Sequence, residues 1–198
     1  AYTARSLAGL IRSCGIPPAD NLHRIGSAIA RYRTRGRPET HPDNPASFLF
    51  RADFAPFTVT SPAEWDRRQE HRPGFPHMLG IRYLGVWDTV GALGIPGHWA
   101  AAPWLNAGLQ FHDTALSRIV RAARHAVAVD EGRRAFAPTL WSNRAALNRQ
   151  ALDLAPQDDL IAVDRDDLPY REEWFPGDHA AVGGSGARRG LSALALLW

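Results

Sequence analysis

Two side chains capable of proton transfer occupy equivalent places in this sequence. Asp88 follows the apolar part of Ile81–Gly91 (IRYLGVWDTVG), and His179 follows that of Glu173–Gly184 (EWFPGDHAAVGG). Each apolar part reads as a short strand that runs directly into a glycine-bearing loop. Because side chains that do chemistry on an open α/β sheet lie at the carboxyl ends of strands, we expect an acid and a base at one edge of a sheet.

An acid followed along the chain by a histidine fits the chain order of the α/β-hydrolase triad, Ser…Asp/Glu…His, in which the serine comes first. In that chemistry the carboxylate accepts the imidazole N–H, and the imidazole acts as the general base. The sequence contains no G-x-S-x-G motif, and Ser185 in GGSG follows no strand. Alternatives remain open: Asp88 as a cap of its own turn, His179 as a surface histidine, and Asp178 as a competing acid.

Other residues near these segments are candidates for substrate contact or for a lid. Trp87 and Thr89 flank Asp88, and Asp178 precedes His179. His98 and Trp99 lie in the Gly- and Pro-rich stretch 91–103. Gly183 and Gly184 begin a GGSG segment that either forms an anion-binding nest of backbone N–H groups or is a plain turn.

A metal site is the weaker interpretation. His112, Asp113, His125 and Asp130 fall on or beside a predicted helix, but there is no H-E-x-x-H motif, and core or capping roles are favoured. The chain also lacks a P-loop and a dinucleotide fingerprint. We therefore expect neither a cofactor nor a metal.

Length and composition limit the classes of protein. The 198 residues suit one domain, the 45% apolar content suits a globular protein, and no 18-residue apolar run is present. All 23 basic residues are arginines, concentrated only in Arg31–Arg37 (RYRTRGR). That run could contact a lipid headgroup or nucleic acid, but a solvated loop is favoured, so we expect no nucleic-acid partner.

The periodicity predicts an α/β protein with a mainly parallel sheet flanked by helices, incomplete at both ends. The segment 33–76 shows no sustained periodicity, which predicts a loop or lid insertion. The predicted helices are Ala1–Cys14, Leu22–Tyr32, Thr114–Val129 and Leu191–Trp198, and the predicted strands are Ile81–Trp87 and Arg171–Pro176.

Several blocks, in order, resemble the type VI secretion phospholipase effector-like catalytic domains, an α/β-hydrolase family. They are Ala1–Gly15 (AYTARSLAGLIRSCG), Tyr83–Gly94 (YLGVWDTVGALG), Phe111–Ser117 (FHDTALS), Ala126–Trp141 (AVAVDEGRRAFAPTLW) and Trp174–Gly184 (WFPGDHAAVGG). The resemblance implies that Asp88 is the triad acid and His179 the base. It also implies that the nucleophilic serine lies in a G-F-S-R-G elbow upstream of Ala1.

The resemblance thus implies that residues 1–198 are part of an α/β-hydrolase catalytic domain of a serine ester hydrolase, lipase- or phospholipase-like. It implies an acyl ester or phospholipid substrate, peripheral membrane contact without a transmembrane segment, and a place in the bacterial cytoplasm or as a secreted effector. The isolated chain is expected to be inactive. The alternative is a non-catalytic binding module, or an inactive remnant, on the same scaffold.

Overall fold

The computed structural model describes residues 2–34, 36–71, 74–90, 115–133, 136–156, 158–185 and 189–198. The chain divides into two compact units. The sheet unit contains Ala1–Tyr2, Tyr83–Arg118 and Ala122–Trp198, and the helical unit contains Thr3–Arg82 and Ile119–Arg121.

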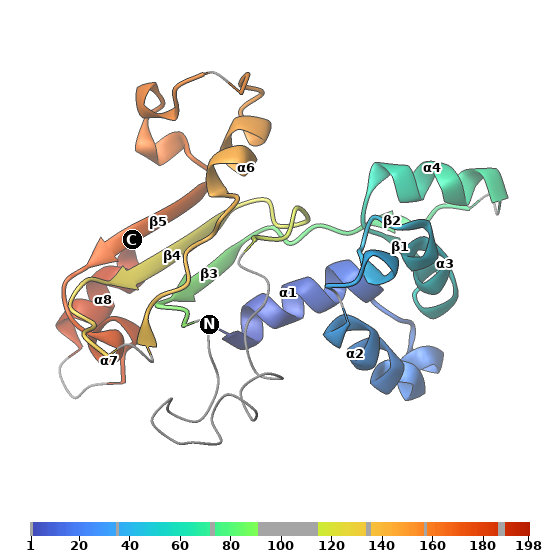
Figure 1. The fold of residues 1–198 in the computed structure, drawn as a ribbon, viewed down its shortest axis with the longest axis horizontal. Coiled ribbons are helices and arrows are strands. Elements are labelled where there is room, and N and C mark those ends of the chain that lie inside the picture. Colours follow the sequence, from blue (N-terminus) through green and yellow to red (C-terminus); the bar gives the residue numbers. More distant parts are fainter. Residues whose placement is uncertain are drawn as a thin grey trace. The chain divides into compact units, whose positions relative to one another are not determined.

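A three-stranded parallel sheet forms the centre of the sheet unit. Its strands are β3 (Leu84–Trp87), β4 (Ala123–Ala128) and β5 (Tyr170–Phe175), in the order β3-β4-β5. The three arrows lie side by side and point the same way in Figure 1. Their carboxyl ends therefore share one edge of the sheet, as expected for an α/β protein.

Short helices pack against this sheet. Helix α6 (Arg144–Ala151) contacts β5, and α7 (His179–Gly183) contacts both β4 and α8 (Gly190–Leu197). The α6 side chain of Asn148 bonds both backbone groups of Tyr170, which fixes the start of β5. Two 3₁₀ turns, η4 (Leu160–Ala162) and η5 (Arg165–Asp167), precede β5. The core under α7 and α8 consists of Ala126, Ala128, Val182 and Ala195.

The helical unit is built mainly from four helices and a two-stranded parallel sheet. Its core contains Cys14, Ala28, Phe54 and Ala55, and burial raises the pKa of the Cys14 thiol. The elements are α1 (Tyr2–Cys14, whose first residue belongs to the sheet unit), η1 (Ala19–Arg24), α2 (Ile25–Arg33), η2 (Pro38–Thr40), α3 (Pro45–Phe54), β1 (Thr58–Val59), α4 (Pro62–His71) and β2 (His77–Met78).

A buried ionic cluster connects three elements of the helical unit. Arg51 on α3 and Glu64 on α4 have fully buried side chains, and Arg51 Nη2 lies 2.9 Å from Glu64 Oε2. Arg51 also donates to the carbonyls of Arg12 and Ser13 at the end of α1 and to that of Pro42. Arg51 and Glu64 therefore tie the end of α1 to α3 and α4.

The predicted parallel sheet is confirmed, and so are the helices at the two ends of the chain. The strand predicted over Ile81–Trp87 is the shorter Leu84–Trp87, and the strand predicted over Arg171–Pro176 is Tyr170–Phe175. The helix predicted over Thr114–Val129 is wrong, because 123–128 form the central strand β4. Five of the six residues of β4 are buried, so its buried and exposed positions do not alternate. Ala123 and Val127 are four residues apart, a spacing that also fits one face of a helix.

The segment 33–76, for which the sequence predicts a loop or lid insertion, contains the helices α3 and α4. The start of α3 carried a readable signal: the Asn44 side chain accepts from the Ala46 N–H, and Pro45 occupies the first helical position. His112, Asp113 and the predicted loop 91–103 lie outside the described residues.

Within the described part of the chain, no helix combines the length and apolar character needed to cross a bilayer.

Candidate active site

Asp88 and His179 meet at the carboxyl edge of the sheet, although they are 91 residues apart in sequence. His179 Nδ1 lies 2.6 Å from Asp88 Oδ2. The Asp88 side chain is fully buried, whereas a third of the His179 side chain is exposed. A buried carboxylate behind a partly exposed imidazole is the arrangement in which the imidazole is oriented on one side and can reach a substrate on the other.

The backbone around Asp88 is unusual and tightly bonded. Asp88 has a φ of 39°, in the left-handed region that residues with a side chain seldom adopt. Its N–H donates to the carbonyl of Ala126, and its Oδ1 accepts from the Ala128 N–H at 2.8 Å. Asp88 Oδ1 therefore accepts from the last residue of β4, and Oδ2 is left for His179. Strained residues of this kind concentrate at functional sites.

His179 is the first residue of a short helix, not part of an open glycine loop. Asp178 is the N-cap of α7, and its side chain accepts from the Ala181 N–H at 2.9 Å. Gly184, with a φ of 83°, ends the helix in the left-handed conformation. Asp178 thus serves as the cap that begins the helix, and Asp88 is the carboxylate that meets His179.

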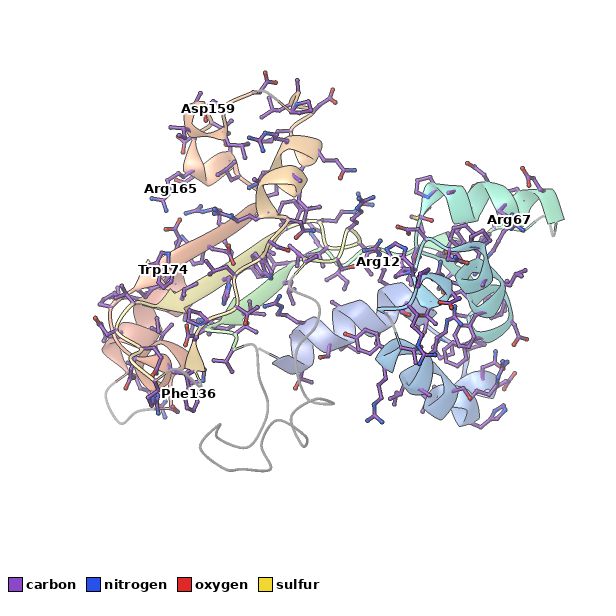
Figure 2. All side chains as sticks on the ribbon, viewed as in Figure 1. Arg12, Arg67, Phe136, Asp159, Arg165 and Trp174 are labelled. Atoms are coloured by element: carbon purple, nitrogen blue, oxygen red, sulfur yellow. The ribbon has the colours of Figure 1, made fainter. Side chains whose placement is uncertain are left out.

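The loop after β4 holds His179 from a second side. Asp130 accepts from the Gly177 N–H, and Glu131 Oε2 accepts from the His179 N–H at 3.2 Å. The Arg133 guanidinium bonds Glu131 and holds its pKa at about 2, well below the ordinary value. Phe136, labelled in Figure 2, lies against the imidazole with ring centroids 5.2 Å apart.

A second histidine lies behind Asp88, and sequence reasoning missed its role. His125 is fully buried on β4, with Nε2 3.1 Å from the Thr89 nitrogen and Nδ1 3.0 Å from Glu172 Oε1. The sequence carried only a weak signal, since Glu172 is one of three consecutive charged residues that begin the predicted strand Arg171–Pro176. The burial of His125 agrees with the core role that the sequence favours.

The remaining candidates divide by position. Trp87 is the last residue of β3 and precedes Asp88. Thr89 follows Asp88 and is buried. Gly183 and Gly184 end α7. His98 and Trp99 lie outside the described residues. Among the residues that are described, no three His, Cys, Asp or Glu side chains gather in a way that would hold a metal ion.

Comparison with known families decides the assignment. Residues 1–198 match the family described as "T6SS, Phospholipase effector Tle1-like, catalytic domain". The chain belongs to this family. No curated protein and no solved structure gives a significant match. Membership in the Tle1-like catalytic domains supports a phospholipase- or lipase-like function and a lipid as the class of substrate.

Proposed function

We propose that this Tle1-like domain contributes the acid and the base of a Ser-Asp-His triad that hydrolyses acyl esters of phospholipids. The observation that carries the proposal is the 2.6 Å contact between Asp88 Oδ2 and His179 Nδ1 at the shared carboxyl edge of three parallel strands. With the proton of the neutral ring on Nδ1 and donated to Asp88, Nε2 is left as the basic nitrogen.

The reaction then follows from this orientation. A serine outside residues 1–198 attacks the acyl carbonyl, and His179 Nε2 takes the serine proton as the bond forms. The imidazolium, stabilised by Asp88, gives that proton to the departing alcohol of the lipid. A water molecule then attacks the acyl-enzyme, giving its proton to Nε2, and the returned proton restores the serine as the fatty acid leaves. The steps require no cofactor.

The proposal is tested with the full-length protein on a fluorogenic phospholipid and on a short-chain ester. We expect His179→Ala and Asp88→Ala each to abolish most of the activity on both substrates. His77→Ala and Asp66→Ala are matched controls, because both side chains are exposed on the helical unit. No activity in a folded full-length protein would contradict the triad and favour the non-catalytic binding module. Activity that neither of the first two substitutions lowers would do the same, because it would then come from another part of the protein.

We also propose peripheral membrane contact by the helical unit. A groove of about 510 Å³ on this unit is lined by α3, the end of α4 and the segment before β2. Phe57 and Phe75 at this groove are 63% and 94% exposed, and the exposed Arg67 lines it with them. Exposed aromatics beside an arginine suit the boundary between acyl chains and anionic headgroups.

Vesicle cosedimentation tests this second proposal. Full-length protein should bind vesicles that contain anionic phospholipid, and Phe57→Ser with Phe75→Ser should weaken that binding severalfold. The matched control is Ile161→Ser, since Ile161 is 90% exposed but belongs to the sheet unit. Equal binding by the double variant and the control would rule out the groove as the contact surface.

A further inference from the structure

The fully buried imidazole of His125 makes two hydrogen bonds that the proposed triad does not use. His125 is the in-register partner of Val86 on β3 and of Glu172 on β5, so it lies in one row across all three strands. Its Nε2 faces the Thr89 N–H at 3.1 Å, and its Nδ1 faces Glu172 Oε1 at 3.0 Å. His125 thus links Glu172 on β5 to the N–H of Thr89, the residue that follows Asp88.

These partners determine the tautomer of His125. A backbone N–H can only donate, so Nε2 must present its lone pair to Thr89, and the ring proton must sit on Nδ1. Glu172 accepts that proton, and its Oε1 also accepts from the Trp141 N–H at 2.9 Å. Arg144 Nε lies 3.5 Å from the other oxygen of Glu172. His125 is therefore a neutral ring in a single orientation.

A titratable side chain, His125, holds the Thr89 N–H of the strained turn. Two neighbouring groups bond to backbone instead: the Asp88 N–H donates to Ala126, and the Thr89 carbonyl accepts from the Thr139 N–H at 2.7 Å. A peptide that was free to rotate between Asp88 and Thr89 would let Asp88 relax from its φ of 39°. Such a relaxation would turn the carboxylate away from His179.

We propose that His125, oriented by Glu172, is a positioning residue that holds the Asp88–Thr89 peptide and so aims the Asp88 carboxylate at His179. The inference rests on the proposed function, since it assigns His125 a role in the same site. It makes the acid of the pair depend on a neutral histidine that touches neither substrate nor His179.

Two substitutions of His125 separate the two hydrogen bonds. Gln reaches the place of Nε2 and can offer its oxygen to the Thr89 N–H, whereas Asn reaches only the place of Nδ1 and can serve only Glu172. In the full-length enzyme we expect His125→Asn to lower kcat by roughly 10- to 100-fold with KM nearly unchanged, the size of effect that a misplaced catalytic group produces. His125→Gln should stay within about threefold of wild type because it keeps the acceptor.

The outcomes are distinct. Loss with Asn and retention with Gln, at equal thermal stability, supports the positioning role. Equal activity of both variants and wild type overturns it, and so does an equal loss in both. If Asp88→Asn and His179→Asn are themselves as active as wild type, the proposed function has failed, and the kinetics of His125 variants no longer bear on positioning.

A second measurement does not depend on activity. In full-length protein labelled with ¹⁵N-histidine, the signal that disappears in His125→Gln belongs to His125. We expect a neutral ring with a protonated Nδ1 and a bare Nε2. A proton on Nε2, or a cationic ring at neutral pH, would be incompatible with acceptance from the Thr89 N–H and would overturn the proposal even if the Asn variant failed to fold.

Discussion

The two units each bury a carboxylate against a basic side chain, and the two pairs differ in how completely they are enclosed. In the helical unit, both Arg51 and Glu64 are fully buried, and Glu64 accepts from Arg51, Arg68 and the Thr60 N–H. In the sheet unit, Asp88 is fully buried but its partner His179 keeps a third of its side chain exposed.

This difference separates a structural pair from a chemical one. Two fully buried side chains present no surface to a substrate, and Arg51 instead connects α1, α3 and α4. A pair with one exposed member has a group left for a substrate. We expect substitutions in the first pair to change the free energy of unfolding and substitutions in the second to change the rate of reaction.

The largest expected effect is on catalysis. Asp88→Asn should lower kcat by about 10⁴-fold, because the amide no longer favours the required tautomer of His179. Its free energy of unfolding should change by less than about 1 kcal/mol, since Asn keeps an oxygen for the Ala128 N–H. Ester hydrolysis and urea unfolding of the full-length protein measure the two. A large loss of stability with little loss of rate would contradict the view that the Asp88–His179 pair acts on the reaction rather than on stability.

The converse substitution acts on the helical unit. Arg51→Met should cost about 3–5 kcal/mol in unfolding free energy, because Glu64 loses its fully buried ionic partner and keeps only Arg68. The carbonyls that accept from Arg51 at the end of α1 also lose their donor. Arg12→Met is the matched control: Arg12 pairs with the half-exposed Asp43, and such surface pairs are worth about 0–1 kcal/mol. If urea unfolding gave comparable costs for the two substitutions, the buried cluster would contribute no more to the free energy of unfolding than a surface ion pair.

A pair of glycines extends the comparison to the backbone. Gly177 has a φ of 106°, and a Cβ added there would lie 2.8 Å from Ala181 Cβ. Gly15 has a φ of 76°, and a Cβ added there would lie 2.7 Å from Ala55 Cβ. Each change to Ala should cost about 1–3 kcal/mol. Only Gly177→Ala should also lower kcat, because it displaces the start of α7 and thus His179. Equal kcat in the two folded variants would contradict this.

The smallest effect is a dependence of stability on pH. Arg133 lowers the pKa of Glu131 from 4.5 to about 2, so ionised Glu131 contributes stability above pH 4.5 that is lost as the pH falls towards 2. The urea concentration at the midpoint of unfolding should therefore decrease as the pH falls through this window. The decrease should be smaller in Glu131→Gln, which lacks the titrating carboxylate. An identical decline in wild type and variant would show that Glu131 does not titrate with unfolding.

Local patterns were enough to place both candidate residues. Asp88 and His179 each follow an apolar segment of strand length, and both segments are strands in the structure, β3 and β5. The helix at Tyr2–Cys14 was predicted equally well from its apolar spacing and from Gly15, whose φ of 76° marks the end of the helix. In each case the signal is contained within about fifteen neighbouring residues.

The strand β4 shows where local patterns are insufficient. Buried on both faces, it has no alternation, and its spacing of alanines is equally compatible with a helix. Because β4 was missed, the sequence could not show that His125 is flanked by Val86 and Glu172, or that the N–H of Ala128 reaches Asp88. These contacts join residues 36 to 47 positions apart, and they exist only once the strands are paired in register.

The sequence by itself determined the residue types for acid–base chemistry, their order along the chain, and their positions at strand ends. The tertiary structure alone decided which acid meets the base. Asp178 is adjacent to His179 in sequence, yet its carboxylate is committed to the cap of α7, while Asp88 arrives from 91 residues away. The physical reason is that parallel strands bring their carboxyl ends to one edge, so the partner of a side chain depends on strand order.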